Sequence, residues 1–340
     1  MGYSTTPQAL FVGKMQRDFF ITADDQIYLD VLGGNLVYAA VGYKLWIDTP
    51  PPGLLARIGE DYPQEWLDVC RKHGLDTRGI KILPQALDLR AFSAPQGDIR
   101  RVAADPVTHF ARLGMQLPKP LLGYRMKSKP MDSKIERTPC SIRQGDIPDE
   151  YHDATIAHLC PLDFLTHGLL PAVFRQEGFS MITLDPSPGY MNPAFFSDYP
   201  SIVTGLTAFL PSEEDMRNLF AGKTEDLHKM AETVASYGCK IVVIKRGVRG
   251  QLLFDAEAGQ FWEIPAYPAR VKDLTGAGDA FCGGFLAGLR NAFDPLEAVL
   301  HGNISASLVC EGSGVFFALD ALPGLAKARL NALRQSVIKL

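Results

Sequence analysis

Several features that mark large classes of protein are absent from this sequence. No run of 18 consecutive apolar residues occurs, so no membrane-spanning helix is predicted. The first residues lack a basic region followed by a long apolar run, so no signal peptide is indicated. Charged residues are dispersed and the formal net charge is −4, which disfavours a nucleic-acid partner. We therefore expect a cytoplasmic protein without a membrane or nucleic-acid partner.

Metal-binding, redox and common phosphate motifs are also missing. The six cysteines include no Cys-x-x-Cys pair, and the seven histidines show neither His-x-His nor His-x-x-x-His spacing. These spacings argue against a zinc site and a thioredoxin-like redox centre. A G-x-G-x-x-G motif would need glycine in place of Phe281, and a Walker A loop would need lysine after Gly283, where Gly284 stands.

The chain does contain a regular alternation of strand and helix patterns, which begins near residue 150. Short apolar runs predict strands at 154–159, 180–185 and 239–244, with helical patterns between them. This alternation predicts an α/β fold with a mostly parallel central sheet and helices on both faces. Active sites of such sheets lie beyond the carboxyl ends of the strands.

The most informative stretch is 273–279, which reads Asp-Leu-Thr-Gly-Ala-Gly-Asp. Two glycines flank Ala277, so the backbone can turn tightly there with its N–H groups exposed. The predicted helix at 277–290 directs its positive end toward the same point, which favours binding of a phosphate or a developing oxyanion. Asp279, in the first turn, could then act as a general base. A helix start with an acidic first turn explains the pattern equally well.

The stretch 273–281 also resembles the second signature of the ribokinase-like (PfkB) carbohydrate kinase family, Asp-x-Thr-Gly-Ala-Gly-Asp-x-Phe, at every fixed position. The resemblance implies ATP-dependent transfer of the γ-phosphoryl group to a hydroxyl of a sugar or related small molecule. It implies that Asp279 is the general base. It also implies that the N–H groups of Gly276, Ala277 and Gly278 hold the transferred phosphoryl group. A nucleoside kinase and a non-catalytic sensor that kept the fold are the alternatives.

The acceptor site is expected in the N-terminal third. Gly33, Gly34 and Asn35 precede a helical pattern and resemble the first signature of the family, in which the backbone approaches the sugar closely. A capped helix start explains the same residues. Asp18 follows the first predicted strand, and its role in gripping acceptor hydroxyls is implied by the resemblance alone.

The resemblance also implies how the chain is organised. We expect one ribokinase-like domain over 1–340, with a small β-sheet lid formed by about 15–32 and 80–97. Residues 98–150 are rich in Pro, Arg, Lys and Met and are unlike the family, so we interpret them as an insertion or extended loop. Lid strands with open edges could pair between two chains, which makes a homodimer one option.

The remaining site residues concern the nucleotide and metals. Lys245 and Gly247 resemble a family turn that touches the nucleotide, although a basic hairpin turn is the alternative, and Asn303 is the candidate to face adenine. Mg²⁺ would arrive with ATP. The family's Asn-x-x-Glu is Ser212 to Asp215 here, so Asp215 is a candidate for the metal that a serine-capped turn also explains.

A monovalent-cation site is the last implication of the resemblance. The segment 307–314 resembles a loop whose carbonyls complete such a site with the first aspartate of the second signature, which is Asp273 here. Phe316 and Phe317 follow where the family often has a small polar residue. The dependence on K⁺ is therefore left open.

Overall fold

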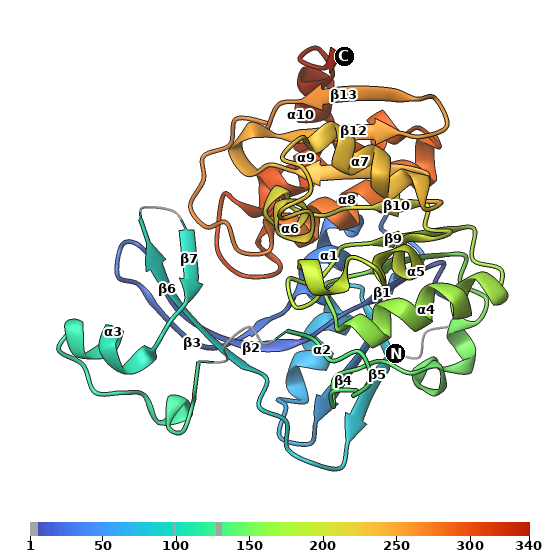
Figure 1. Cartoon of the computed structure of the whole chain (residues 1–340). Coiled ribbons are helices and arrows are strands. Elements are labelled where there is room, and N and C mark those ends of the chain that lie inside the picture. The colour runs from blue at the N-terminus through green and yellow to red at the C-terminus, as the bar shows by residue number, and fades with distance from the viewer. Residues whose placement is uncertain (1–5, 98–99, 127–130) are drawn as a thin grey trace.

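A computed structural model describes residues 6–97, 100–126 and 131–340, which form a large sheet covered by helices and a small sheet beside it (Figure 1). The large sheet has ten strands in the order β14-β13-β12-β11-β10-β9-β8-β1-β4-β5. The seven neighbouring strands from β5 to β11 in this order run parallel. At the other end of the sheet, the pairs β11–β12, β12–β13 and β13–β14 are antiparallel. This confirms the predicted α/β class.

The bounds of the strands in the large sheet are β1 Ala9–Val12, β4 Gly53–Gly59, β5 Asp76–Leu83, β8 Ile156–Leu159, β9 Met181–Leu184, β10 Ala208–Phe209, β11 Ile241–Lys245, β12 Gln251–Asp255, β13 Gln260–Ile264 and β14 Ile338–Lys339. The helices are α1 Asn35–Lys44, α2 Glu65–Lys72, α3 Pro106–Arg112, α4 Phe164–Gln176, α5 Tyr199–Val203, α6 Glu213–Leu219, α7 Leu227–Ser236, α8 Ala277–Ala292, α9 Pro295–Val309 and α10 Leu325–Arg334. None of the helices in these described parts is long and apolar enough to cross a bilayer.

Alternate residues of the strands feed two hydrophobic cores, one on each face of the large sheet. Val243 belongs to the core under α1, α2, α8, α9 and α10, whereas its neighbour Val242 belongs to the core under α4 to α7. Because successive side chains of a strand point to opposite faces, a short and wholly apolar strand fits this two-sided burial. This physical requirement explains the uninterrupted apolar runs in the sequence.

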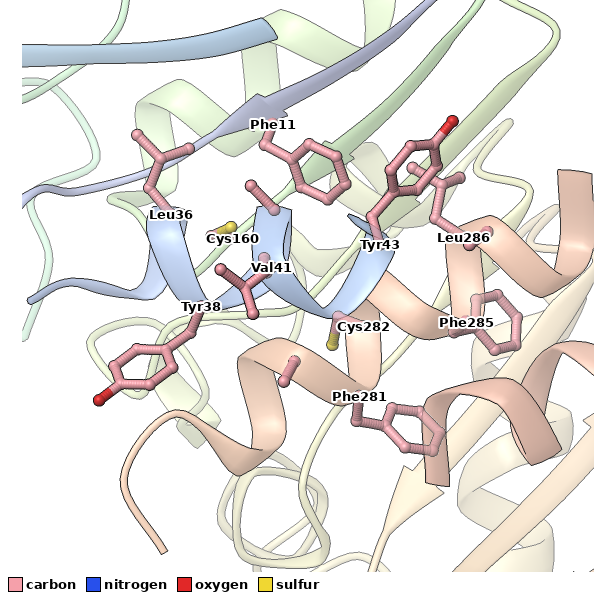
Figure 2. Packing of buried hydrophobic residues seen from close by; sticks show 14 of the residues in the cluster. Phe11, Leu36, Tyr38, Val41, Tyr43, Cys160, Phe281, Cys282, Phe285 and Leu286 are labelled. Atoms are coloured by element: carbon pink, nitrogen blue, oxygen red, sulfur yellow. The ribbon is translucent and has the colours of Figure 1, made fainter. Parts of the chain in front are cut away.

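Helices α1 and α8 are in backbone contact (Figure 2). A Cβ added to Gly42 would overlap the carbonyl oxygen of Ala280, and one added to Gly283 would overlap that of Ala39. Only glycine allows the two helices to approach this closely, which offsets its cost of about 1 kcal/mol in a helix. The packing fixes the N-terminus of α1 relative to the N-terminus of α8.

The small sheet has four strands in the order β3-β2-β6-β7, with bounds β2 Gln16–Ile21, β3 Ile27–Gly33, β6 Arg90–Gln96 and β7 Arg100–Ala103. One of its faces packs on Phe110 of α3 and on Leu121. Strands from the expected lid segment 15–32 and from the second half of the expected segment 80–97 thus lie in one sheet. Its closure over a substrate, and the division of the chain into one domain with a lid, stay proposals.

Two expectations about this region differ from the structure. Residues 80–83 do not join the small sheet, because they extend β5 and pair with β4, where Ile80 lies opposite Ala56. An alternating pattern cannot show which of two sheets a strand joins. Within the segment 98–150, residues 98–99 and 127–130 lie outside the described residues. The described part supplies β7 to the small sheet and α3, which packs against that sheet, and its Asp146 pairs with Arg57 of β4 at 2.7 and 2.9 Å. It is therefore more than an extended loop, and its interpretation as an insertion stays a prediction.

The edges of the small sheet bear on the expected homodimer. Its outer strands are β3 and β7, and β3 carries the exposed side chains of Tyr28 and Leu29. An edge strand with exposed apolar residues is a surface on which a second strand could pair. The homodimer stays a prediction.

Candidate active site

The segment 273–278, which we call the glycine loop, leads directly into α8. Gly276 precedes the helix with φ 76°, a left-handed conformation that glycine adopts at little cost. A Cβ at this position would overlap the ring of Tyr38 on α1. The first N–H groups of a helix lack partners within it, and no side chain caps α8. The helix N-terminus is therefore suited to an anionic group, as the sequence predicted.

One of the three predicted N–H donors of the loop is already engaged. The N–H of Ala277 donates to the carbonyl of Leu274 at 3.2 Å. Gly278 is exposed, and an added Cβ there would meet Lys245 Nζ at 3.7 Å. Gly278 therefore lies next to the Lys245 ammonium, so an anionic group bound at the helix N-terminus would also be close to this positive charge.

A cluster of buried charges lies beneath the glycine loop. Lys245 Nζ, at the end of β11, donates to Asp185 Oδ2 at 2.5 Å, and Cys282 Sγ of α8 lies 3.5 Å from both atoms. Burial disfavours the Lys245 ammonium, but the charge of Asp185 outweighs it, so the pKa of Lys245 is raised. Burial raises the pKa of Asp185 to about 6, although Lys245 opposes the rise. Lys245 therefore stays a cation at the loop.

Asp279 lies in the first turn of α8 and retains partial access to solvent. Its dense surroundings and, to a smaller extent, the charge of Asp185 together raise its pKa to about 7, and Lys245 opposes the rise. A carboxylate with a pKa near neutrality can accept a proton at physiological pH and release it afterwards. These properties are those a general base needs.

The residues predicted to bind the acceptor come from β2 and from the end of β3. Asp18 of β2 packs so closely against Gly33 that a Cβ at Gly33 would overlap its carboxylate. Burial raises the pKa of Asp18 to about 7, with Arg101 opposing and Asp273 adding to the rise. Because Asp273 and Arg101 both act on Asp18, the N-terminal strand and the glycine loop border one site.

The side-chain amide of Asn35, which is predicted to bind the acceptor, is already hydrogen-bonded within the protein. Its Oδ1 accepts a hydrogen bond from the N–H of Lys14 at 2.8 Å, and its Nδ2 donates to the carbonyl of Pro161 at 2.9 Å. Gly34, with φ 109°, lies so close to Lys14 that a side chain would overlap the Lys14 carbonyl. These contacts join the start of α1 to the ends of β1 and β8. The amide could bind a hydroxyl only in addition to them.

A pocket of about 470 Å³ borders the glycine loop, and Leu274, Ala277 and Gly278 are among its lining residues. Its walls are mostly apolar, and Lys245 and Gly278 line its inner end. Gly247 has φ 58° and no atom within 4 Å of an added Cβ, so the turn after β11 leaves the entrance open. Lining residues include Val248, Tyr267, Leu274, Phe281, Asn303 and Ala306.

Asn303 lines this pocket but uses its amide elsewhere. Its Oδ1 accepts from the N–H of Tyr267 at 2.9 Å, and its Nδ2 donates to Gln251 Oε1 and to the Pro265 carbonyl, both at 2.8 Å. The side chain is only 3% exposed. It therefore holds the pocket wall in place, and its direct contact with adenine stays a prediction.

The candidate metal residues have protein partners. Asp215 Oδ2 accepts from the N–H of Ser212 at 3.1 Å and from its hydroxyl at 2.5 Å, which is the serine-capped turn that the sequence left open. Asp273 is 3% exposed and pairs with Arg101 of β7. In the described parts of the chain, no three His, Cys, Asp or Glu side chains are grouped as a metal site would require.

Three residues of the site were not found from the sequence. Asp185 follows the buried strand β9, so its position at a carboxyl end was a usable signal. Tyr38 lies in the first turn of α1, and no local sequence pattern marks it as a site residue. Arg101 lies in the segment interpreted as an insertion, where nothing local distinguished it from its basic neighbours.

Comparison with known proteins places these features in context. The sequence pattern of the family described as pfkB family carbohydrate kinase matches residues 168–322. The chain is 28% identical over 255 residues to the cytidine kinase of Thermococcus kodakarensis, covering 72% of this chain and 76% of that protein. It is 32% identical over 149 residues to an uncharacterized sugar kinase of Archaeoglobus fulgidus, covering 43% of this chain and 55% of that protein.

Solved structures with the same fold cover nearly the whole chain. A nucleoside kinase of Burkholderia thailandensis in complex with inosine superposes with a TM-score of 0.67 at 18% identity, covering 96% of this chain and 98% of that one. A fructokinase double mutant of Vibrio cholerae with fructose, ADP and potassium ion bound gives 0.67 at 18% identity, covering 97% and 99%. At such identities the likeness concerns the fold.

Proposed function

Because the chain belongs to the PfkB family of carbohydrate kinases and has the ribokinase-like fold, we propose that it transfers the γ-phosphoryl group of ATP to a hydroxyl of a sugar, either free or within a nucleoside. The observation that carries the proposal is the position of Asp279. This carboxylate, with a pKa of about 7, directly follows Gly278, which lines the 470 Å³ pocket, and lies in the first turn of the helix that packs against α1.

The pocket beyond the glycine loop suits the nucleotide. Its apolar walls match the faces of a purine base, and its inner end carries the Lys245 ammonium and the N-terminus of α8. Both carry positive charge toward the place where the phosphates of ATP would lie. The negative charge that moves onto the leaving ADP is stabilised by the same groups.

Transfer then needs one proton to leave the acceptor hydroxyl. Asp279 accepts this proton as the hydroxyl oxygen attacks the γ-phosphorus and the bond to the ADP oxygen breaks. Asp18 orients the acceptor through its carboxylate, and Gly33 and Gly34 allow the backbone to approach it. Closure of the small sheet would exclude water, which competes with the acceptor for the phosphoryl group.

The carboxylates of Asp185 and Asp215 near Lys245 are compatible with Mg²⁺ delivered by ATP. Oxygen atoms of carboxylates are the ligands that Mg²⁺ prefers, and it usually keeps several water ligands beside one or two carboxylates. Asp185 and Asp215 are the residues that would hold such waters, and the charge of Asp215 already acts on Asp185. When bound, Mg²⁺ would neutralise charge on the phosphates.

A nucleoside acceptor is the second candidate, favoured by the 28% identity to a cytidine kinase over 76% of its length. The small sheet carries a stacked pair of rings, Phe20 and Tyr28, whose centroids lie 4.4 Å apart. The ring of Tyr28, which is 38% exposed, could stack on a base.

The test is ADP release from Mg-ATP with a panel of sugars and nucleosides, using Asp279→Asn as the matched inactive variant. We expect one acceptor class to give turnover and the variant to lose roughly 10²–10⁴-fold in rate while still binding nucleotide. Near-normal rates in the variant would refute the role of Asp279. A thermal shift with a sugar or nucleoside, but no turnover with any, would instead favour the non-catalytic sensor.

A further inference from the structure

Arg101 of β7 crosses from the small sheet to the glycine loop. Its Nη2 donates to Asp273 Oδ2 at 2.7 Å and to Thr275 Oγ1 at 2.6 Å, and its Nε donates to Asp273 Oδ1 at 3.2 Å. The side chains of Arg101 and Asp273 are only 6% and 3% exposed. This is a two-pronged ion pair almost excluded from water, the geometry in which arginine binds a carboxylate most specifically.

The carboxylate of Asp273 has its acceptor sites filled. Besides Arg101, Oδ1 accepts from the N–H of Thr275 at 3.0 Å and Oδ2 accepts from the hydroxyl of Ser313 at 3.1 Å. Two hydrogen bonds on each oxygen match the capacity of an ionised carboxylate. A monovalent cation would have to displace one of these donors.

In the segment 307–314, two backbone carbonyls that could bind a cation already accept hydrogen bonds. The carbonyl of Cys310 accepts from the N–H groups of Lys272 at 2.8 Å and Asp273 at 3.2 Å. The carbonyl of Gly314 accepts from the N–H of Phe317 at 3.3 Å. The residues that would hold a monovalent cation, judged from the resemblance, therefore do not fit one here.

The small sheet in turn holds Arg101. The guanidinium carbon lies 3.5 Å from the centroid of the Phe20 ring, and Nη1 donates to Ser93 Oγ at 3.4 Å. Phe20 is on β2 and Ser93 on β6, so neighbouring strands of the sheet set the position of the guanidinium. The chain of contacts runs from the small sheet through Arg101 and Asp273 to the N–H of Thr275, next to Gly276.

We propose that Arg101 is a built-in cation that takes the place of a monovalent ion at Asp273 and positions the glycine loop when the small sheet lies over it. The positive charge is supplied by the chain, so phosphoryl transfer does not depend on K⁺. The loop has its transfer geometry only while β7 is docked, which couples that geometry to the position of the small sheet. Arg101 is thus a positioning residue that acts through Asp273.

The first experiment is thermal melting, which needs no acceptor and is independent of the proposed function. Arg101→Ala leaves the Asp273 charge buried and unpaired, so we expect Tm to fall on the order of 5 °C. K⁺ should recover part of this loss relative to N-methyl-D-glucamine at equal ionic strength, whereas the wild type should respond equally to both ions. Arg112→Ala, which removes an exposed pair with Asp25, is the control and should show no K⁺ response.

The second experiment measures kinase rate against K⁺ concentration, and it rests on the proposed function because it needs a working acceptor. The wild type should be unaffected by K⁺, and Arg101→Ala should lose on the order of ten- to a hundredfold in kcat, partly restored by K⁺. Activation of the wild type by K⁺ would overturn the proposal. A variant with unchanged rate, or a loss of rate and Tm that K⁺ does not restore, would overturn it equally.

Discussion

The Lys245 ammonium lies 2.5 Å from Asp185 Oδ2, and the side chains are only 14% and 7% exposed. These residues stand at the carboxyl ends of β11 and β9, with β10 between the two strands. The pair is therefore held from two strands of a rigid sheet beneath the glycine loop. It supplies a fixed positive charge next to Gly278 without a flexible side chain in open solvent.

Replacement of Lys245 tests this pair. Lys245→Met leaves the Asp185 carboxylate buried without its cation, so we expect a loss of about 3–5 kcal/mol in the free energy of unfolding. The double variant Lys245→Met, Asp185→Asn removes both charges and should regain most of that stability but no activity. Chemical denaturation and ADP release measure the two quantities. If the double variant is no more stable than the single, charge is not what couples the residues.

The rate should depend on pH through Asp279. Its pKa of about 7 lies above that of an ordinary aspartate, and the base acts only when ionised. We therefore expect kcat/KM to fall about tenfold per pH unit below pH 7 and to level off above it. Asp279→Asn should lack this limb, measured at high enzyme concentration. A wild-type profile that stays flat down to pH 5 would contradict the role of Asp279.

The raised pKa of Asp279 also affects stability: a rise in pH, which should increase the rate, should destabilise the folded protein. The folded pKa of about 7 exceeds the unfolded value of 3.8, so the carboxyl favours folding when protonated and this contribution is lost as pH rises toward 7. Asp279→Asn should therefore raise Tm by roughly 2–4 °C at pH 8 and by less at pH 5. Melting curves at the two values measure the difference. An equal gain at both would point to a packing effect.

Asp18 should act on the acceptor alone. A hydrogen bond to a charged group contributes about 1.5–3 kcal/mol, so Asp18→Ala should raise the acceptor KM roughly ten- to a hundredfold and leave the KM for ATP unchanged. Asp24→Ala, in the exposed turn between β2 and β3, is the matched control and should change neither constant. An unaltered acceptor KM for Asp18→Ala would place the acceptor elsewhere.

Substitution by alanine should have different effects at Gly276 and at Gly278, lowering Tm at the first and kcat at the second. At Gly276 the left-handed φ and the overlap with Tyr38 predict a lower Tm, because a left-handed residue other than glycine alone costs about 1–2 kcal/mol. At Gly278 the added methyl would lie 3.7 Å from Lys245 Nζ, an ordinary contact, so folding should be normal. The methyl would nevertheless occupy the approach of the phosphates, so kcat should fall about tenfold or more. Melting and steady-state kinetics on both variants distinguish the effects.

The glycine loop could be predicted because its properties are local. Glycine spacing sets the turn, and the apolar stripe of α8 sets the helix that begins at Ala277, as expected from the sequence. The central strands were found for the same reason, since a strand buried on both faces is apolar throughout. Family resemblance then supplied the chemistry that spacing left open.

The residues that sequence missed depend on contacts between distant segments. Arg101 is 172 positions from Asp273, and nothing in its own surroundings indicates that pairing. For Asn303 the resemblance alone suggested a contact with adenine, which stays a prediction, and it gave no sign that the amide is bound by residues 36 to 52 positions away. Asn35 likewise reaches Pro161 across 126 positions. Such partners are set by the folded sheet order, which periodicity does not specify.

The contact between α1 and α8 limits how this enzyme can change its substrate. One helix begins beside Gly33 and Gly34, the other begins at the glycine loop, and their backbones meet at Gly42 and Gly283 with no space for a side chain. On the proposed assignment of the site, the spacing between acceptor and phosphate donor is set by two helices whose contact leaves no room for a side chain at Gly42 or Gly283. A larger or smaller acceptor has to be accommodated by the small sheet. Divergence of substrate range within this architecture is thus expected in the strands β2, β3, β6 and β7, while the helix pair is retained.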